Sequence, residues 1–355
     1  MNKKIILVII GILVVAGIIA AVLILQKPEP KTVIYVTIVS HNEDDDERYG
    51  SYNIKEGYLE FRDALLKMVD LIMKYNASYD FQPEWKFLEA ALKYEKGDVL
   101  KNTNNKNILR YFKEDLGIQI DPHSHEGYGY NYADVAYLIK QLGVEPSNVV
   151  GGFLAYPNIF GEGEIVWEKF REPLKGQKYD YTWNTTVLWG GAVLNHQGDE
   201  HPTSGVYRPK NQEEFRVHDP SGNLIVIGTG GYLGNLEKLI DDIYISKKAP
   251  SDKMYTLSIM FMERDVWLGG EKKLLQYETI LKEVDSYVKQ GSVKWATLSE
   301  IVEIWKTEYN SEPNIYECES IQQLPGEAGG AQEKCGDGIC DEVERQTGKC
   351  PEDCD

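Results

Sequence analysis

The chain has 355 residues, of which 42% are hydrophobic and 11% aromatic. This composition excludes a disordered chain and provides enough apolar side chains for a sizeable core. The formal net charge of −18 at pH 7 argues against a nucleic-acid partner, because phosphate binding requires clustered Lys and Arg side chains. Neutral or cationic ligands are expected instead.

The N-terminus carries an apolar segment long enough to cross a membrane. Residues 5–25 form an unbroken apolar run that, as a helix, spans roughly 30 Å, the thickness of one bilayer core. Lys3 and Lys4 precede it, and the positive-inside tendency places the rest of the chain outside the cytoplasm. A cleaved signal peptide is the alternative, although no small-x-small site follows the run. The sequence therefore predicts a membrane anchor and linker over residues 1–30 and a globular part at the cell surface.

Predicted strands and helices alternate over residues 31–308. Runs of β-branched and other apolar residues predict strands at 32–40, 117–121, 149–155, 224–228 and 255–262. Helical spacing and capping signals predict helices at 56–75, 234–245 and 271–289, and further helices that start after Asn131 and Thr297. Such alternation indicates a parallel sheet with crossover helices. A closed or nearly closed β/α barrel is expected, with an open doubly wound sheet as the alternative. Residues 309–334 lack an apolar period and are interpreted as a linker.

Five consecutive carboxylates, Glu43 to Glu47, follow the first predicted strand. In a parallel β/α domain, the carboxyl ends of the strands carry the active site. One carboxylate of an adjacent pair can bind a cation while its neighbour takes a proton from water. A solvated acidic loop is the other interpretation of this run.

Two histidines, His123 and His125, follow the strand predicted at 117–121. Because they are two residues apart, an extended backbone points both imidazoles to the same side, as two ligands of one metal ion require. Two imidazoles and one carboxylate leave coordination positions for water and substrate, which is the arrangement of a hydrolytic metal site. The two strand ends are therefore predicted to converge on a divalent metal, and these ligand types favour zinc.

These motifs resemble those of the polysaccharide deacetylase family, whose fold is a distorted seven-stranded β/α barrel. Glu43-Asp44 occupies the place of the paired carboxylates of that family, and Ile120-Asp-Pro-His123 resembles its Ile-Gly-Asn-His pattern. The strand at 255–262, the helix at 271–289 and Trp295-Ala-Thr-Leu-Ser-Glu300 are similar to its closing elements. The resemblance covers roughly residues 32–308 and implies a distorted (β/α)7-type barrel.

The resemblance also implies that Glu43 is the general base and that Asp44, His123 and His125 bind the metal. Three features depart from the family pattern. The metal histidines of the family are four residues apart, whereas position 127 is Gly here, and the first carboxylate is Glu rather than Asp. Met262-Glu-Arg-Asp265 stands where the family has a late catalytic histidine, so the general acid is unassigned.

The function predicted from the sequence is metal-dependent hydrolysis of an N- or O-acyl group on an extracellular carbohydrate. One alternative is a barrel without catalytic activity that binds glycan or a surface protein, which the missing late histidine favours. Another is a glycoside hydrolase, with Glu263 or Asp265 opposite Glu43. Residue types that stack on sugar rings or bind hydroxyls give four candidate substrate contacts, although buried rings usually only fill space: Tyr156, Trp183, Arg208 and His218.

The five cysteines all lie near the C-terminus. Four of them fall within residues 335–355, a segment too short for its own core, so disulfides are expected to hold it: Cys335, Cys340, Cys350 and Cys354. They allow three pairings, and Cys318 is left over. The segment is similar to short Cys-Gly-Asp-Gly-x-Cys modules of exported microbial proteins. Its hard oxygen ligands predict a calcium site: Asp337, Asp341, Glu344 and Asp353.

Overall fold

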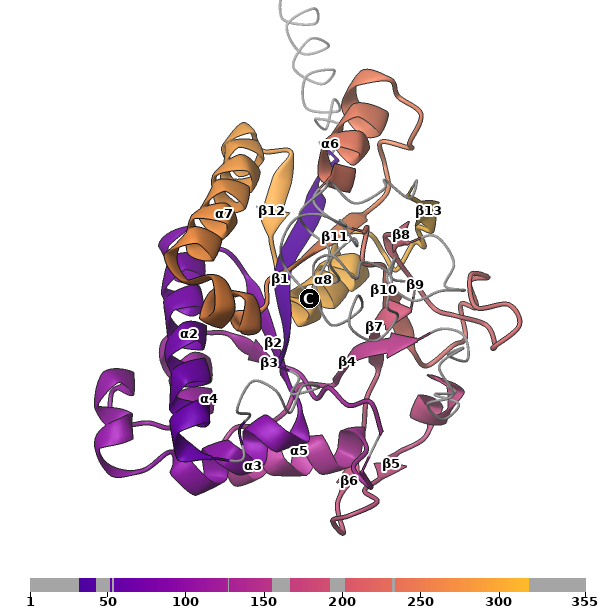
Figure 1. Cartoon of the computed structure of the whole chain (residues 1–355). Coiled ribbons are helices and arrows are strands. Elements are labelled where there is room, and N and C mark those ends of the chain that lie inside the picture. The colour runs from indigo at the N-terminus through magenta and orange to yellow at the C-terminus, as the bar shows by residue number, and fades with distance from the viewer. Residues whose placement is uncertain are drawn as a thin grey trace, which may run out of the picture. The chain divides into compact units, whose positions relative to one another are not determined.

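The computed structural model describes residues 32–42, 52, 54–126, 128–154, 167–191, 202–231 and 234–318 (Figure 1). The chain divides into two units, residues 1–319 and 320–355, and all the described residues belong to the first. Several predicted features lie outside the described residues: the apolar run at 5–25, Glu43, Asp44, Tyr156 and the Cys-rich tail. Across the described ranges, no helix has both the length and the apolar character needed to cross a membrane.

The main strands and helices alternate along much of the chain. The strands are β1 Ile34–Asn42, β2 Tyr79–Pro83, β3 Gln119–Ile120, β4 Val149–Leu154, β5 Leu174–Lys175, β6 Thr182–Trp183, β7 Val187–Gly191, β8 Thr203–Ser204, β9 Val206–Tyr207, β10 Ile225–Ile227, β11 Tyr255–Met260, β12 Val293–Trp295 and β13 Tyr316–Glu317. The α-helices are α2 Lys55–Lys74, α3 Trp85–Tyr94, α4 Ile108–Arg110, α5 Tyr132–Gln141, α6 Gly234–Ile240, α7 Glu263–Gln290 and α8 Leu298–Thr307. Shorter helical turns are η2 Gly97–Thr103, η3 Tyr111–Asp115, η4 Trp167–Arg171 and η5 Asp241–Ile245.

The side chains of β1 alternate between two buried faces. Ile34, Val36 and Ile38 belong to the core under α2 and α7, whereas Tyr35 and Val39 face the second sheet and α8. Because both faces are covered, the whole strand reads as an apolar run, as strands of parallel sheets do. The predicted strand at 32–40 is therefore confirmed, and it continues to Asn42.

The strands form two main sheets in which almost all neighbours are parallel. The first has the order β11-β1-β2-β3, with β12 also paired to β1. The second has the order β4-β7-β10-β9, and only the pair β10–β9 is antiparallel. On one edge of β1, β12 pairs with residues 34–36 and β2 with residues 38–42. The predicted parallel sheet with crossover helices is confirmed.

The two main sheets meet at two seams instead of forming one continuous ladder. At the first seam, between β3 and β4, His123 bridges Gly151 and the Gly151 N–H donates to the Pro122 carbonyl at 2.9 Å. At the second, the Ser258 N–H of β11 donates to the carbonyl of Thr229, beyond β10, at 2.7 Å. The expectation of a barrel is thus met in part: the fold is a parallel α/β fold, and within the described ranges the strands do not close into a barrel.

Helices cover the outer faces of both sheets, and α8 lies between the sheets (Figure 1). α2 and α7 pack together on the first sheet, and α5 packs on the second. α8 buries Leu298, Ile301 and Trp305 against side chains of β1, β7 and β10. Its start is fixed by the predicted capping box, in which Thr297 and Glu300 bind each other's backbone N–H groups.

Two differences from the predicted elements have a local cause. The helix predicted at 271–289 begins earlier, at Glu263, and continues through a kink at Gly270, where φ is 54° and ψ is −137°. The strand β2 is not indicated by the sequence pattern, because Asp80 and Gln82 place polar side chains at buried positions. The buried polar side chains of β2 are therefore the reason why the sequence pattern does not predict this strand. They form part of the hydrogen-bond network described below.

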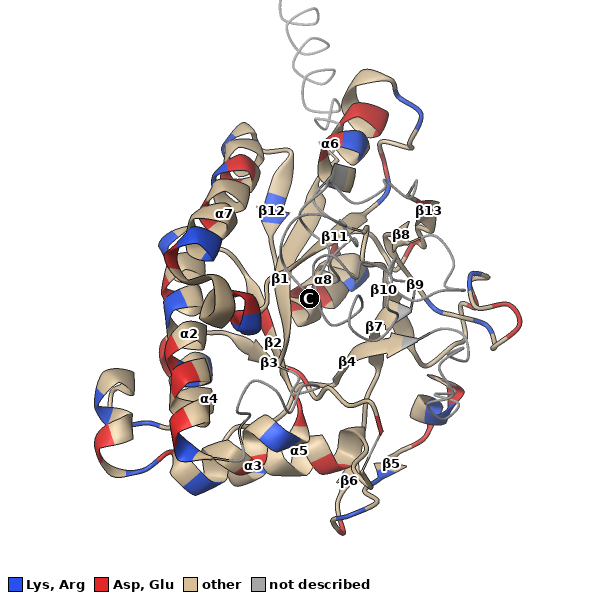
Figure 2. Ribbon diagram, in the orientation of Figure 1, with Lys and Arg blue, Asp and Glu red and all other residues tan. Residues whose placement is uncertain are grey.

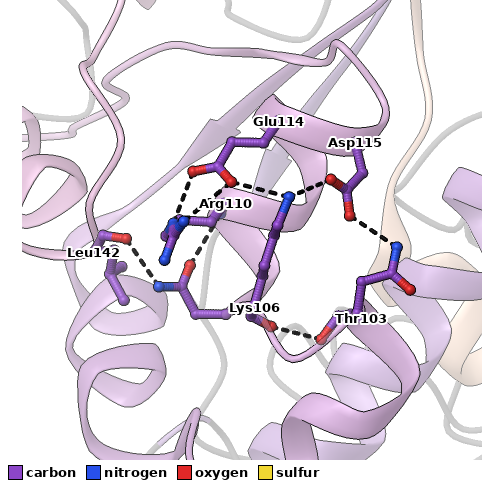
Figure 3. Close-up of polar contacts among 8 residues, drawn as sticks. Thr103, Lys106, Arg110, Glu114, Asp115 and Leu142 are labelled. Carbon is purple, nitrogen blue, oxygen red and sulfur yellow. Dashed lines mark hydrogen bonds and ion pairs between the residues drawn. The ribbon is translucent and has the colours of Figure 1, made fainter.

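A network of charged side chains holds the segment that leads into β3 (Figure 3). Glu114 binds Arg110 at 2.7 Å and Lys106 at 3.0 Å, and Lys106 also pairs with Asp115. The Asn107 side chain accepts from the Arg110 N–H at 3.0 Å. The same side chain donates to the carbonyl of Leu142, at the end of α5, at 2.8 Å. The network ties the entry to β3 to the helix that follows it.

Charged side chains otherwise lie mainly on the helices and loops, with both signs mixed on α2 and α7 (Figure 2). The exposed pair of Lys67 and Asp63, at 2.7 Å, is typical of them and contributes little to stability. A different case is Arg62, whose Nε lies 2.6 Å from Glu95 with both side chains at most 3% exposed. Removing one partner of such a buried pair leaves the other charge without compensation.

We expect Arg62→Ala to lower the free energy of unfolding by about 3–5 kcal/mol, because Glu95 stays buried without its partner. Lys67→Ala, on the same helix, is the matched control and should change it by less than about 1 kcal/mol. Urea unfolding followed by circular dichroism measures both. Equal effects of the two substitutions would contradict the assignment of Arg62 as a buried structural charge.

Candidate functional site

His123 lies at the first seam and is only 2% exposed. Its Nδ1 lies 2.6 Å from the carbonyl oxygen of Gly151. A carbonyl oxygen only accepts hydrogen bonds, so Nδ1 carries the proton and the neutral ring has its lone pair on Nε2. The seam therefore fixes both the orientation and the tautomer of this imidazole.

His125 brings a second imidazole to the same point, and we call these two residues the histidine pair. The two Nε2 atoms are 3.3 Å apart, and the rings lie at 88° to each other. The buried Ser124 between them braces the turn, because its Oγ accepts from the Glu126 N–H at 2.9 Å and donates to the Tyr130 carbonyl at 3.3 Å. The imidazoles converge, as their spacing predicts.

A third histidine, His41 near the end of β1, lies against the pair, although the sequence motifs do not single it out. Its ring stacks on His123 with centroids 4.0 Å apart and planes at 21°. Its ring also meets Trp189 of β7 edge-on at 5.6 Å. The Trp189 indole N–H donates to Ser258 Oγ at 2.8 Å, so His41 connects the residues of both seams. Its position two residues before Glu43, at the same strand end, is the signal that could have revealed it.

Gly152 of β4 is the surface on which His41 and His123 pack. Its φ is +68°, a left-handed conformation that favours glycine. A Cβ atom there would lie 2.6 Å from Cε1 of His41 and 2.9 Å from Cε1 of His123. The Tyr132 hydroxyl donates to its carbonyl at 2.7 Å and holds this backbone in place. Position 152 therefore requires glycine for two reasons: its backbone has a positive φ, and a Cβ atom would collide with both histidine rings.

We expect Gly152→Ala to displace the histidine rings and to lower the free energy of unfolding by more than the roughly 1–2 kcal/mol of the backbone conformation alone. Gly97→Ala is the matched control, because Gly97 has φ +62° but nothing within 4 Å of the added methyl group. Thermal unfolding and the imidazole NMR signals of both variants test this. Equal destabilisation with unchanged histidine signals would refute the packing argument.

A buried polar network surrounds Asp121, two residues before His123. Its carboxylate accepts from Ser147 Oγ at 2.5 Å, from Gln119 Nε2 at 2.7 Å and from Gln82 Nε2 at 3.2 Å. Burial nevertheless raises the pKa of Asp121 to about 6, because these hydrogen bonds oppose the shift only in part. The carboxyl group links β2 and β3 to Ser147, just before β4, and so supports the first seam from inside.

Asp80 of β2 belongs to the same interior. It is fully buried, and its carboxyl group accepts from Thr37 Oγ1 and from the Leu298 N–H at the start of α8, at 3.1 Å. Burial, followed by the charge of Asp121, raises the pKa of Asp80 well above its usual value. The N-terminal N–H groups of α8 are satisfied by this network, which fixes where the helix enters the space between the sheets.

The raised pKa of Asp121 predicts a pH dependence of stability. The folded state holds its proton up to about pH 6, whereas an unfolded Asp loses it near pH 4, so this contribution to stability is complete below pH 4 and is lost as the pH rises through 6. The unfolding free energy of wild type minus that of Asp121→Asn should fall by roughly 3 kcal/mol between pH 4 and 7. Urea unfolding across this range measures it.

Glu278→Gln is the control, because its effect on the free energy of unfolding should change with pH in the opposite direction. Hydrogen bonds from Lys74 and Tyr75 lower the pKa of Glu278 to about 2, so the advantage of wild type over this variant should grow as the pH rises from 2 through 4. A flat difference for Asp121→Asn would show that the carboxyl group is ionised throughout the range.

The histidine pair fits two positions of a metal site. Two nitrogen ligands at roughly 2.0–2.1 Å from a tetrahedral ion lie about 3.3–3.4 Å apart, and the Nε2 atoms of His123 and His125 are separated by 3.3 Å. The same distance also suits a hydrogen bond from His125 to His123. Among the described residues, no group of three or more His, Cys, Asp or Glu side chains is placed to hold a metal. The predicted carboxylates Glu43 and Asp44 directly follow β1, outside those residues.

Of the candidate sugar contacts that the structure describes, Trp183 is buried, whereas Arg208 and His218 are partly exposed. Trp183 is 4% exposed, and its indole N–H donates to the Ser147 carbonyl at 3.0 Å. The guanidinium of Arg208 lies over the Trp305 ring of α8 at 4.9 Å, and the Arg208 N–H donates to His218 Nδ1 at 3.2 Å. Burial and the charge of Arg208 lower the pKa of His218. The structure does not bring these residues together with the histidine pair.

The two carboxylates proposed for glycosidic cleavage have structural contacts at the start of α7. Glu263 is fully buried and accepts from the Asn42 amide at 2.6 Å. Asp265 lies 3.1 Å from both Lys273 Nζ and the Tyr277 hydroxyl. Because a glycosidase carboxylate must reach the sugar, the burial of Glu263 gives the glycoside hydrolase alternative no support.

No protein-family model matches the sequence, and the search of curated proteins finds no significant match. Several solved structures match the backbone of this chain with low similarity. The Puue allantoinase is 14% identical with a TM-score of 0.47, over 78% of this chain and 91% of its own. A probable polysaccharide deacetylase from Pseudomonas aeruginosa PAO1 is 13% identical with a TM-score of 0.47, over 78% of this chain and 92% of its own. The 4-alpha-glucanotransferase of Thermococcus litoralis is 11% identical with a TM-score of 0.46, over 81% of this chain but only 42% of its own.

These similarities do not establish a common family, because the TM-scores stay below 0.5 and the identities below 15%. The three similar proteins also carry different activities in their names. Function must therefore be argued from the residues of the site.

Proposed function

We propose that the protein is a metal-dependent hydrolase that removes an N- or O-acyl group from an extracellular carbohydrate. The observation that carries the proposal is the convergence of His123 Nε2 and His125 Nε2 at 3.3 Å, beside the carboxyl ends of parallel strands. The carbohydrate substrate is supported by the motif resemblance described above. The net charge of −18 favours a neutral or cationic glycan over an anionic one.

The residues proposed to hold the ion are Asp44, His123 and His125. Zinc fits two imidazoles and one carboxylate better than calcium or magnesium does, since those ions prefer oxygen ligands. A bound divalent ion of this kind polarises an acyl carbonyl and lowers the pKa of water. We also propose that the C-terminal segment binds calcium through Asp337, Asp341, Glu344 and Asp353 and is held by disulfides among its four cysteines.

Other residues are proposed to take up a proton or to position the ligand His123. Glu43 is proposed as the base that takes the proton of the attacking water. The Gly151 carbonyl keeps the proton of His123 on Nδ1, so that Nε2 is always the basic atom of this ring. His41 and Gly152 cover the ring of His123 and prevent it from turning. These contacts preorganise His123, one of the proposed ligands, before any ion or substrate binds.

We expect the purified full-length protein in detergent to contain about one equivalent of zinc per chain by elemental analysis. His123→Ala/His125→Ala should lose the metal and the hydrolysis of acetylated sugars together. His218→Ala is the matched control, because His218 contacts Arg208 and should leave the metal content unchanged. Glu43→Gln should keep the metal while slowing hydrolysis by about 10²-fold or more, as loss of a general base does.

Failure of wild type to retain or rebind metal would overturn the hydrolase proposal. The barrel without catalytic activity that binds glycan or a surface protein would then be the better interpretation. Metal retained in the double histidine variant would show instead that other residues bind it.

We also propose that residues 5–25 anchor the chain in a membrane with the globular part outside the cytoplasm, on the basis of the apolar run and the preceding lysines. Protease added to intact cells should then cleave sites after residue 30 and release the globular part. Full protection in intact cells, with cleavage only after lysis, would contradict this orientation.

A further inference from the structure

The loop that carries His125 also presents an exposed aromatic ring. Tyr128 is 84% exposed, although it lies only three residues from His125, so their Cα atoms are no more than about 11 Å apart. Its φ is +54°, and that of Glu126 is +55°. Positive φ is uncommon for residues with a side chain, and such backbone is found where the surrounding structure imposes it.

Contacts on both sides hold this loop in its unusual conformation. Glu126 is bound on its N–H by Ser124 Oγ at 2.9 Å and on its carboxylate by Lys169. On the other side, Tyr130 is 2% exposed and donates its hydroxyl hydrogen bond to Glu89 of α3. Described residues on both sides of Tyr128 are therefore held by hydrogen bonds or ion pairs, while its own ring is exposed to solvent.

The ring of Tyr128 lies near that of Trp85, which itself packs on a buried tyrosine. Trp85, at the start of α3, lies with its ring centroid 6.0 Å from that of Tyr128, at 51°. Trp85 also stacks on the buried Tyr130, with centroids 4.2 Å apart and planes at 6°. The ammonium of Lys86 lies 5.5 Å from the Tyr128 centroid and 5.8 Å from that of Trp85. We call Trp85 and Tyr128 the aromatic platform; it combines two rings with a hydrogen-bond donor beside them.

We propose that the aromatic platform binds a sugar ring of an uncharged oligosaccharide whose acyl group lies at the histidine pair, so that the substrate is a chain of sugars rather than a monosaccharide. This inference rests on the proposed function. Aromatic rings offer a flat apolar face with little conformational freedom to lose, which suits the C–H face of a pyranose. Lys86 can donate to a ring hydroxyl. Because Tyr128 is three residues from His125, their Cα atoms lie within about 11 Å, so one oligosaccharide can reach both the platform and the histidine pair.

Exposure of the Tyr128 ring without a ligand is unfavourable, because apolar surface stays in water and the backbone is held at positive φ. Trp85 and Lys86 contact the Tyr128 ring but leave most of it exposed. Stacking of a sugar would cover the ring, and the net charge of −18 selects against acidic glycans approaching the same surface.

The test is calorimetric titration of the full-length protein in detergent with chitotetraose and with N-acetylglucosamine. Wild type should bind the tetrasaccharide more tightly than the monosaccharide. Tyr128→Ala should weaken tetrasaccharide binding by roughly 3- to 10-fold and leave monosaccharide binding unchanged. Tyr128→Phe keeps the ring and should bind as wild type does. Leu275→Ala, at a 62% exposed apolar position on α7, is the control for removing exposed apolar surface elsewhere.

Equal tetrasaccharide affinity of wild type and Tyr128→Ala would overturn the platform, as would absence of any tetrasaccharide binding by wild type. The titrations use metal-depleted protein, so that hydrolysis adds no heat and the readout is binding alone. If the metal and hydrolysis experiments fail while Tyr128-dependent binding persists, the hydrolase proposal falls and the platform stands as a glycan-binding site. If hydrolysis of a monosaccharide ester is zinc-dependent but Tyr128→Ala changes no affinity, only the platform is refuted.

Discussion

The hydrogen bond between His123 Nδ1 and the Gly151 carbonyl is the interaction on which the candidate site depends. It joins the two sheets where β3 is too short to form a full ladder with β4. It also sets the tautomer of His123, since a carbonyl can only accept. The same hydrogen bond therefore holds the seam together and sets the tautomer of His123. A change that opens the seam is expected to disturb the imidazole, and a change of the imidazole to loosen the seam.

The space between the sheets is unusual because polar groups are buried there beside an apolar helix. Asp80 of β2 and Asp121, directly after the neighbouring strand β3, are both fully buried, and the Leu298 N–H at the start of α8 donates to Asp80. Buried carboxyl groups cost free energy unless they are hydrogen-bonded or protonated, and here both remedies operate. Because hydrogen bonds are directional, they fix the positions of α8 and Ser147 more precisely than apolar packing would. The first seam, and with it His123, rests on this network.

The arrangement of histidines also bears on how the chain could differ from enzymes with similar motifs. His41 is stacked against His123 and does not converge with the pair on one point, so it supports the site by packing. Glu263 stands near the position where a late histidine would be expected, and it is buried against Asn42.

Features of short range are those that the sequence by itself determined. Strand β1, helices α2 and α5, the capping boxes of α5 and α8, and the common direction of the histidine pair all follow from spacings of two to four residues. Such patterns report local backbone periodicity, which a single sequence records directly. The strand β2 escaped prediction because its inward residues Asp80 and Gln82 are polar, and polarity indicates burial only when its partners are known.

Only the tertiary structure decided how distant segments combine. The stacking of His41 on His123, the need for glycine at position 152, and the approach of Trp85 to Tyr128 each join residues far apart in the sequence. Two sheets joined at seams, in place of one closed barrel, likewise depend on where each strand ends relative to its neighbours. These relations are set by packing and hydrogen bonds across the whole domain, and local periodicity carries no record of them.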